Sequence, residues 1–284
     1  MRVNLSFKHF SVSFVFIWML IFSLIPFCLI VISSFMSHSE NNLIELPVTL
    51  ANYAELNQSI TFRIFQKSFL MAITCTFFCL LLGYPFAFII ARMKSRFKNI
   101  LLLLIMIPFW TSTLIRSYAL IAMLKAKGVI SSILMAIGLI DQPLSILYTN
   151  YAVMIGLVYN LLPFMILPIL TNVERLDERL IDAAKDLGAG WFTIFGKVIL
   201  PLTMPGMIAG SILVFLPAMT LFYIPDILGG AKSILLGNLI QNQFLISQNW
   251  PMGSAFSVVL TLMLVILILI YALNQRGNKK QAWL

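Results

Sequence analysis

Residues 182–201 read DAAKDLGAGWFTIFGKVILP and belong to the longest charged loop of an otherwise apolar chain. Asp177 precedes this stretch, and we expect it to cap a helix over about 178–187. Gly188 stands where such a helix needs a left-handed residue after its end. Residues 191–200 can form a second helix, which leads into the next apolar segment. The stretch therefore predicts two short helices joined by a glycine corner.

The first predicted helix has two different faces. Its apolar side chains recur at helical spacing and form one stripe, composed of Leu180, Ile181, Ala184 and Leu187. Asp182, Lys185 and Asp186 lie off that stripe, where they can face a polar partner. The small side chains of Ala183 and Ala184 leave room for close approach. Two interpretations stay open from these residues: a surface on which another protein docks, or an amphipathic loop that lies on lipid.

The rest of the chain has the composition of a membrane protein. Of its 284 residues 61% are hydrophobic and 10% are charged, whereas a soluble domain carries about 25% charged residues. A helix needs about 20 apolar residues to cross the hydrocarbon. We expect membrane-spanning helices at about 10–36, 68–91, 99–124, 148–172, 198–225 and 252–273. The apolar segment 129–140 is too short to span and suits an interfacial or re-entrant helix. The predicted fold class is an all-α integral membrane protein with six transmembrane helices.

The positions of lysine and arginine predict the orientation, because cytoplasmic segments carry an excess of both. Thirteen of the 19 such residues fall on one side if the tails 1–9 and 276–284 and the loops 92–98 and 174–197 are cytoplasmic. Residues 37–66 then form a periplasmic segment ahead of the main transmembrane region, 67–275. The net charge of +9 reflects this bias and attraction to anionic membrane lipid, so no nucleic-acid partner is expected.

The sequence lacks the residues and motifs that several kinds of chemistry require. It has no glycine-rich phosphate loop ending in Gly-Lys-Ser/Thr, so we expect no ATP site in this chain. His9 and His38 are its only histidines, which argues against a metal site or a Ser-His hydrolase. Cys28, Cys75 and Cys79 fall in predicted spans and are expected to be packing residues. We therefore expect no catalytic residue, no metal and no cofactor bound by the chain itself.

The loop resembles the EAA motif of binding-protein-dependent ABC importer permeases. That motif reads Glu-Ala-Ala, three residues, Gly, nine residues and then Ile-x-Leu-Pro. Asp182 replaces the usual Glu and Val198 the usual Ile, and both changes keep charge or shape. The loop also stands between the fourth and fifth of six spans, as it does in that family. The resemblance implies a type I ABC importer permease fold. It also implies an ATPase-coupling loop that comprises Asp182, Ala183, Ala184, Asp186, Gly188, Leu200 and Pro201.

Shorter strings extend the resemblance over roughly residues 45–275. LGYPFA at 82–87, IPFWT at 107–111 and PLTMPG at 201–206 are similar to strings in the permeases of spermidine/putrescine importers. That resemblance implies a multi-pass protein of the bacterial inner membrane that translocates polyamines. It also implies a heterodimer with a second permease subunit, two copies of a cytoplasmic ATPase that binds the ATP, and a periplasmic polyamine-binding protein.

A polyamine is a polycation, and its path across hydrocarbon needs carboxylate, carbonyl or aromatic groups. The sequence offers as candidates Trp110, Tyr159, Tyr223 and Asp226. The aromatic residues could equally belong to an interfacial belt or to the packed core. Asp226 could attract a cation or could pair with Arg116 or Lys232.

Two other functions are compatible with the sequence. Permeases for other small solutes share the loop motif, so the chain could serve an importer of a different substrate. A channel or secondary transporter that works without ATP is the second alternative, and co-purification of an ATPase would exclude it. A membrane enzyme is disfavoured because no nucleophile–base pair is visible.

Overall fold

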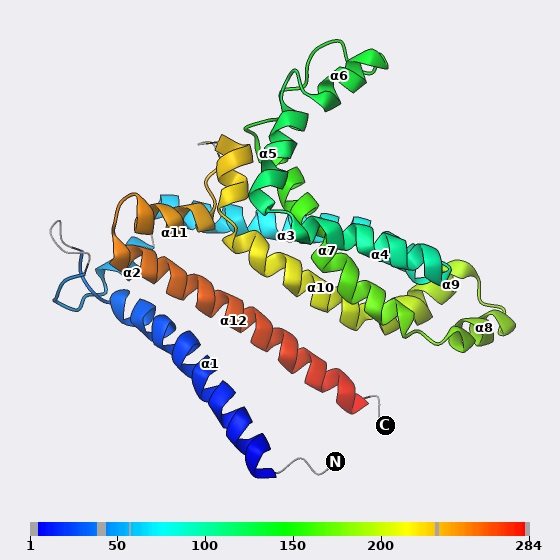
Figure 1. Cartoon of the computed structure of the whole chain (residues 1–284), viewed down its shortest axis with the longest axis horizontal. Helices are drawn as coiled ribbons and strands as arrows, with labels where there is room; N and C mark the ends of the chain where they lie inside the picture. The colour runs from blue at the N-terminus through cyan, green and yellow to red at the C-terminus, as the bar shows by residue number, and fades with distance from the viewer. Residues whose placement is uncertain (1–4, 39–43, 57, 231–232, 282–284) are drawn as a thin grey trace. The chain divides into compact units, whose positions relative to one another are not determined.

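The computed structural model describes residues 5–38, 44–56, 58–230 and 233–281 (Figure 1). The regular structure in these ranges is helical, apart from one isolated bridge between Ser37 and Glu45. Six helical stretches among the described residues are long and apolar enough to cross a membrane. They are Val12–Ser33, Ser59–Ala91, Thr113–Ala136, Asn150–Glu174, Trp191–Thr220 and Trp250–Leu269. The predicted all-α fold with six membrane helices is confirmed.

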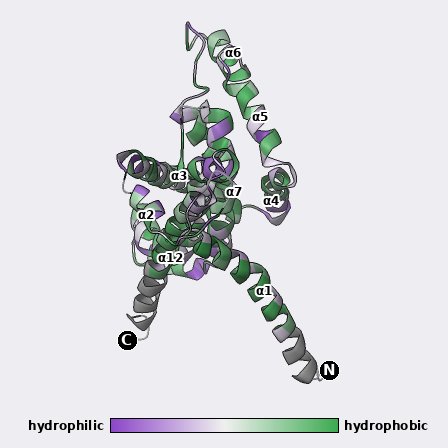
Figure 2. Cartoon of the chain, turned by 90° about the vertical axis from the view of Figure 1, so that its left-hand side faces the viewer, coloured by the Kyte–Doolittle hydropathy of each residue, from purple (hydrophilic) through white to green (hydrophobic). Residues whose placement is uncertain are grey.

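The chain divides into two compact units, of which the first comprises Met1–Arg63 and Leu239–Leu284. Its helices are α1 (Leu5–Ser33), α2 (Ala51–Glu55) and α12 (Trp250–Gln281), and both α1 and α2 contact α12. The described part of α1 is mostly hydrophobic (Figure 2). Asn52 of α2 closes the end of α1, since its Nδ2 donates to the carbonyls of Ser34 at 3.0 Å and Met36 at 2.8 Å.

The second unit comprises Ile64–Asn238 and carries the predicted loop. Its elements begin with α3 (Ser59–Ala91), α4 (Ser95–Trp110), α5 (Thr113–Leu124), α6 (Val129–Ala136) and α7 (Asn150–Glu174). They continue with α8 (Glu178–Asp186), α9 (Trp191–Ile194), the π-helix η1 (Phe195–Ile199) and α10 (Leu200–Thr220). The π-helix η2 (Pro225–Gly229) follows, and α11 (Leu236–Leu245) begins at the end of this unit and continues into the first.

The most extensive helix–helix contact of the second unit joins α7 and α10. Glycines on α10 let the two backbones approach closely. A Cβ placed on Gly206 would lie 2.7 Å from the carbonyl oxygen of Pro168, and one on Gly210 would lie 2.8 Å from Sδ of Met165. These glycines are four residues apart, the small-xxx-small spacing by which membrane helices pack through van der Waals contact.

The stretch 99–124, expected to be one span, is two helices. Thr111 has an extended backbone, with φ −94° and ψ 142°, and separates α4 from α5. Its N–H and its hydroxyl both donate to the carbonyl of Pro108, at 3.3 and 2.9 Å, so the last turn of α4 closes locally. A threonine hydroxyl competes with the helix for backbone partners in this way. The third span-length stretch is instead Thr113–Ala136, formed by α5 and α6.

Candidate functional site

The first predicted loop helix is α8, which runs from Glu178 to Asp186. Asp177 caps it as expected, because its Oδ1 accepts a hydrogen bond of 3.0 Å from the N–H of Arg179. Glu178 in the first turn and Lys185 in the last turn suit the helix dipole. The local sequence around Asp177 is therefore enough to fix the residue at which α8 begins.

Gly188 forms the predicted corner after α8. Its φ is +79°, in the left-handed region where a Cβ is strained. The Gly188 N–H donates to the carbonyl of Lys185 at 2.8 Å, and the Ala189 N–H donates to that of Ala184 at 3.0 Å. These two bonds define a Schellman motif, which satisfies the last carbonyls of a helix.

The second predicted helix continues into the membrane helix through a wider turn. α9 leads into η1, in which the N–H of Leu200 reaches back to the carbonyl of Phe195. Pro201 follows directly and has no N–H, and its ring would clash with the carbonyl four residues earlier. A π-turn at this place absorbs that clash without breaking the helix. The stretch Trp191–Thr220 is therefore mechanically continuous.

A hydrophobic cluster fixes α8 to the start of this long helix. Ile181, Ile194 and Ile199 are 3%, 2% and 0% exposed and form its centre. The partly buried side chains packed on them are Phe88, Leu176, Ala184, Ala189, Phe195 and Val198. Burial of one such isoleucine contributes about 1.5–3 kcal/mol. The cluster therefore joins α8, α9 and η1 to the end of α3.

Aromatic side chains extend this cluster along α3. Phe88 meets Trp191 edge-on with ring centroids 6.2 Å apart, and Tyr84 meets Phe195 in the same way at 5.8 Å. The Tyr84 hydroxyl also shares a buried hydrogen bond of 3.0 Å with the Thr203 hydroxyl of α10. Sequence reasoning missed this set. The available signal was the four-residue spacing of the aromatic residues within each helix.

The predicted apolar stripe of α8 is only half buried. Ile181 and Ala184 face the cluster, whereas Leu180 is 48% and Leu187 89% exposed. Leu187 is the C-cap, and the left-handed turn that follows carries the chain away from the cluster. Phe192 of α9 is also 89% exposed. Leu187 and Phe192 thus add apolar contacts to an otherwise charged surface.

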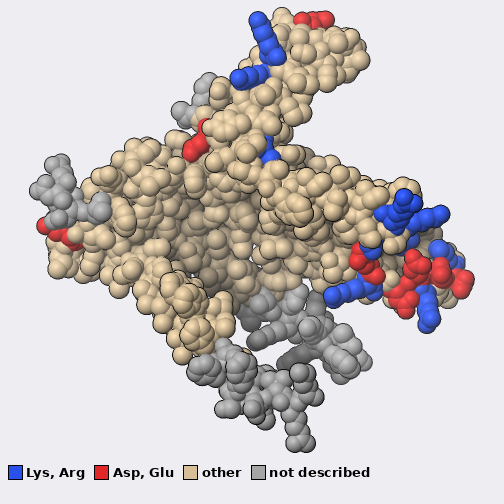
Figure 3. Space-filling model, in the orientation of Figure 1, with Lys and Arg blue, Asp and Glu red and all other residues tan. Residues whose placement is uncertain are grey.

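Charged side chains gather at the end of the second unit that carries α8 (Figure 3). Lys185 pairs with Asp182 at 2.9 Å on the exposed face of the helix. Lys98 of α4 pairs with Glu174 at the end of α7 at 2.6 Å. Asp182, Ala183 and Asp186 are exposed, as expected for residues that face a partner.

The four candidates for a cation path come from α4, α7 and the segment around η2. Tyr223, two residues before η2, is partly buried, and its ring centroid lies 5.9 Å from that of Phe222. Trp110 at the end of α4 is 83% exposed and Tyr159 of α7 is 45% exposed. The exposed Asp226 of η2 accepts a hydrogen bond from Nδ2 of Asn238. Arg116 donates to the Thr113 hydroxyl at 3.2 Å, and the described residues include no ion pair between it and Asp226. Lys232, the other proposed partner of Asp226, lies outside the described residues.

Asn238 organises the segment around η2 and was not expected from the sequence. It is 2% exposed. Its Nδ2 donates to the Phe222 carbonyl at 2.7 Å as well as to Asp226, and its Oδ1 accepts from the Leu235 N–H at 3.1 Å. Both polar atoms of this amide therefore form hydrogen bonds that fix the connection between α10 and α11.

Replacing Asn238 with leucine is expected to destabilise the protein. The change leaves the buried N–H of Leu235 without its partner, at a cost of about 1–3 kcal/mol, so the thermal midpoint of the purified protein should fall by several degrees. Asp226→Asn is the matched control, because its amide oxygen still accepts from Asn238. An unchanged midpoint in Asn238→Leu would contradict the role given to Asn238.

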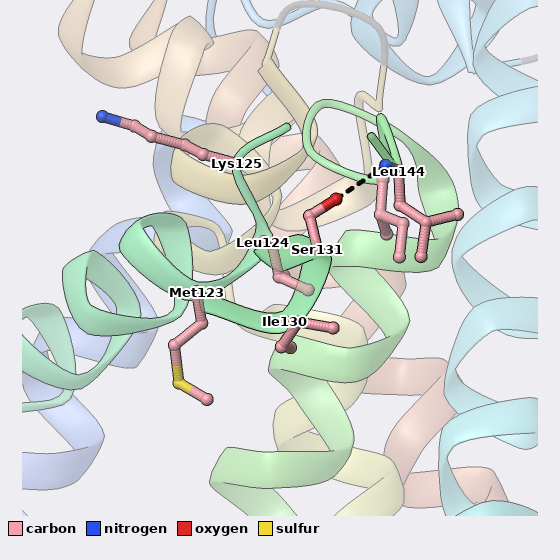
Figure 4. A pocket seen from close by; sticks show the side chains of 7 residues that line it. Met123, Leu124, Lys125, Ile130, Ser131 and Leu144 are labelled. Atoms are coloured by element: carbon pink, nitrogen blue, oxygen red, sulfur yellow. Dashed lines mark hydrogen bonds between the residues drawn. The ribbon is translucent and has the colours of Figure 1, made fainter. Parts of the chain in front are cut away.

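A small hollow under the turn between α5 and α6 is unsuited to a cation. Its lining comprises Met123, Leu124, Lys125, Ile130, Ser131, Leu144 and Ile146. The Ser131 hydroxyl accepts a hydrogen bond of 2.7 Å from the Leu144 N–H, and the Lys125 side chain points away from it (Figure 4). The hollow is otherwise apolar, so it belongs to the packing of α6.

Comparison with known families identifies the class of protein. The family described as "Binding-protein-dependent transport system inner membrane component" matches residues 83–279, a range that includes α8, Gly188 and all of α10. The chain belongs to this family. It is therefore a multi-pass permease of the inner membrane, as the loop motif predicted.

Curated relatives of this permease cover nearly its whole length. It is 46% identical to the spermidine/putrescine transport system permease protein PotB of Haemophilus influenzae, over 98% of this chain and 96% of that protein. It is 44% identical to PotB of Escherichia coli K12, over 89% of this chain and 92% of that protein. The inner membrane ABC transporter permease protein YdcU of E. coli K12 is 32% identical, over 79% and 74%.

Solved structures with the same fold are also permeases. A chain of the bacterial alginate ABC transporter, crystallised with its alginate-bound periplasmic protein, gives a TM-score of 0.76 at 14% identity, over 93% of this chain and 92% of that one. A second alginate importer structure gives 0.74 at 16% identity, over 95% of both chains. These likenesses show the type I ABC importer permease fold.

Proposed function

We propose that this permease translocates polyamines, spermidine or putrescine, with energy from a separate ATPase that acts on α8 and the Gly188 corner. The observation that carries the proposal is the cluster of Ile181, Ile194 and Ile199, which joins α8 to the long helix Trp191–Thr220 and to α3. A force on α8 is thereby transmitted to two membrane helices at once. The names of the PotB relatives support the choice of substrate.

The partners follow from this arrangement. The chain lacks a phosphate loop, so a cytoplasmic ATPase must bind and hydrolyse the ATP. We assign the α8 face to the cytoplasm together with both termini, in keeping with the distribution of lysine and arginine. The complete importer then comprises this chain, a second permease subunit, two ATPase copies and a periplasmic polyamine-binding protein.

The surface offered to the ATPase combines charge with two apolar side chains. Asp182, Ala183 and Asp186 are exposed on α8, and Leu187 and Phe192 project on either side of the Gly188 corner. Three residues of the coupling loop lie beneath that surface. Ala184 packs in the cluster, and Leu200 and Pro201 begin α10. An apolar pocket with polar surroundings on the ATPase would be complementary.

The substrate path within this proposal uses the four candidates named from the sequence. Trp110, Tyr159, Tyr223 and Asp226 supply aromatic faces and one carboxylate for a polycation. Uptake of labelled spermidine and putrescine by cells that lack other polyamine uptake tests the substrate, and its loss on ATP depletion tests the energy source. Uptake of a different solute only, or uptake that survives ATP depletion, would reject the proposal.

Gly188→Val is expected to reduce uptake about tenfold and to weaken co-purification of the ATPase. A Cβ on Gly188 would meet no atom within 4 Å, so the effect comes from the backbone alone. The left-handed conformation costs a residue with a Cβ about 1–2 kcal/mol, and a β-branched residue tolerates it least. The corner would then open and move α8. The measurements are initial uptake rates and the ATPase-to-permease ratio after purification.

The chain offers a matched control two residues away. A Cβ placed on Gly190 would also meet no atom within 4 Å, but the φ of this residue is −71° and its ψ 161°, a conformation open to any residue. Gly190→Val should therefore retain uptake and assembly. If Gly188→Val also transports and assembles normally, the Gly188 corner does not transmit the force.

A further inference from the structure

Asn160 is a polar residue at the centre of a membrane helix. It lies ten residues into α7 (Asn150–Glu174), about 15 Å from the start of the helix at 1.5 Å per residue. That depth is close to the middle of a hydrocarbon layer about 30 Å thick. Polar side chains at such depth are costly and are found where a membrane protein handles its substrate.

The two polar atoms of the Asn160 amide are in different situations. Nδ2 donates to the carbonyl of Gly156 at 2.8 Å. Oδ1 is buried and has no hydrogen-bond partner among the described residues. The Gly156 carbonyl can only accept, so the nitrogen is the atom that faces it and the oxygen is the free one. The unpaired group is therefore an acceptor, which suits an N–H donor.

A second acceptor lies within the same turn. Pro163 has no N–H, so it cannot pair with the carbonyl of Tyr159, four residues before it. In a membrane, a carbonyl freed in this way needs another partner. The middle of α7 thus carries two oxygen acceptors in adjacent residues, beside the aromatic ring of Tyr159.

The side chain of Asn160 faces the inside of the second unit. The residue is 4% exposed, so its oxygen is not available to another chain on the outer surface. One turn earlier, Gly156 meets Leu228 of η2 and Ile224, the residue before η2. A Cβ on Gly156 would clash with Cδ1 of Leu228 and would lie 3.0 Å from Cγ2 of Ile224. On the α3 side, the thiol of Cys79 lies 3.8 Å from the Val158 carbonyl. Leu228 and Ile224 therefore pack on α7 one turn before Asn160.

We propose that Oδ1 of Asn160 binds an ammonium group of the transported cation, and that Leu228 of η2 and Ile224, just before η2, close this site from the periplasmic side. The proposal rests on the polyamine function stated above. An ammonium group presents N–H donors and a positive charge, so it pairs with both oxygen acceptors of this turn. Movement of η2 away from Gly156 would expose Oδ1 of Asn160 to the periplasm.

The test compares two substitutions at one position in the complete importer. The complex with its second permease, ATPase and binding protein is reconstituted in liposomes, and the uptake of labelled spermidine is measured over a range of concentrations. Asn160→Leu removes both polar atoms at similar volume. We expect it to lower uptake about tenfold, the change produced by losing one charge-assisted hydrogen bond, without lowering the thermal midpoint. Asn160→Asp keeps an oxygen acceptor and should retain uptake with a lower KM.

Asn172 provides the matched control on the same helix. Its Nδ2 donates to the Pro168 carbonyl at 3.0 Å, the same four-residue bond that Asn160 makes, and its oxygen is not among the buried unpaired atoms. Asn172→Leu should keep the KM of the wild type. An equal loss in Asn172→Leu and Asn160→Leu would overturn the proposal.

The remaining outcomes separate three explanations. Wild-type uptake in Asn160→Leu would reject the ammonium site and leave the polyamine function intact. Equal losses in Asn160→Leu and Asn160→Asp, with a lowered midpoint, would assign Asn160 a structural role through its bond to Gly156. Failure of the wild-type complex to take up spermidine would reject the polyamine function, and the ammonium site with it.

Discussion

Gly206→Leu is expected to prevent the permease from accumulating as a folded protein. Gly206 lies where α10 crosses α7, and a Cβ there would come within 2.7 Å of both the Pro168 carbonyl oxygen and Nδ2 of Asn172. A backbone oxygen cannot move aside as the end of a flexible side chain can. The two helices must therefore separate, and they form the most extensive contact of the second unit.

The size of this effect follows from the nature of membrane packing. Apolar surface gains little from leaving lipid, so α7 and α10 are held largely by close van der Waals contact between them. Overpacking a well-packed core costs about 1–3 kcal/mol or more, and here it also loosens the neighbouring contact of Gly210 with Met165. We expect most of the protein to be degraded or aggregated, with a greatly reduced monodisperse peak on gel filtration in detergent.

Gly196→Leu is the control for Gly206→Leu. Gly196 belongs to η1, is exposed, and has no atom within 4 Å of a Cβ placed on it. The same substitution there should leave the yield and the elution profile unchanged. A normal yield and thermal midpoint for Gly206→Leu would show that α7 and α10 can separate without loss of the fold.

The sequence predicted those features that depend on neighbours along the chain. Asp177 and Gly188 define the ends of α8 because a cap and a left-handed corner need only local hydrogen bonds. The long apolar helices other than the third were found because a helix that crosses lipid must be long and apolar along its whole length. These features require no knowledge of which helices touch.

Features that depend on contacts between distant segments were missed. The bond between Tyr84 and Thr203 joins residues 119 positions apart, and no periodicity in either helix indicates it. The sequence places Ile181 and Leu187 in one apolar stripe of α8, but only Ile181 is buried, because a left-handed turn follows Leu187. In the sequence Asn160 is one neutral polar residue among many; its unpaired oxygen is visible only when the neighbouring helices are in place.

Ile181→Asp is expected to disconnect the ATPase from the membrane helices. Ile181 is 3% exposed at the centre of the cluster with Ile194 and Ile199. A carboxylate in that position would lose its hydration without gaining a partner, and burial of an unpaired charge is among the most costly single changes. α8 would leave the cluster to bring the charge into water. The spans themselves do not depend on Ile181, so the thermal midpoint of the permease should change little.

The expected readouts are a loss of uptake and a loss of coupling. We expect spermidine uptake by the complete importer to fall more than about tenfold, since the displacement costs several kcal/mol. The stimulation of ATP hydrolysis by the loaded binding protein should disappear as well, because it requires the same connection in the opposite direction. Both are measured on the reconstituted complex, beside the amount of ATPase that co-purifies with the permease.

Leu180→Asp distinguishes burial from charge. Leu180 is the neighbouring residue on the same helix and is 48% exposed, so a carboxylate there stays hydrated. It changes the charge of α8 by the same amount as Ile181→Asp. If both variants lose uptake equally, the added charge is responsible and the cluster has no special part in coupling. If only Ile181→Asp loses uptake, while its spans stay folded, the force of the ATPase must pass through the contact of Ile181 with Ile194 and Ile199, because that contact is what the two variants do not share.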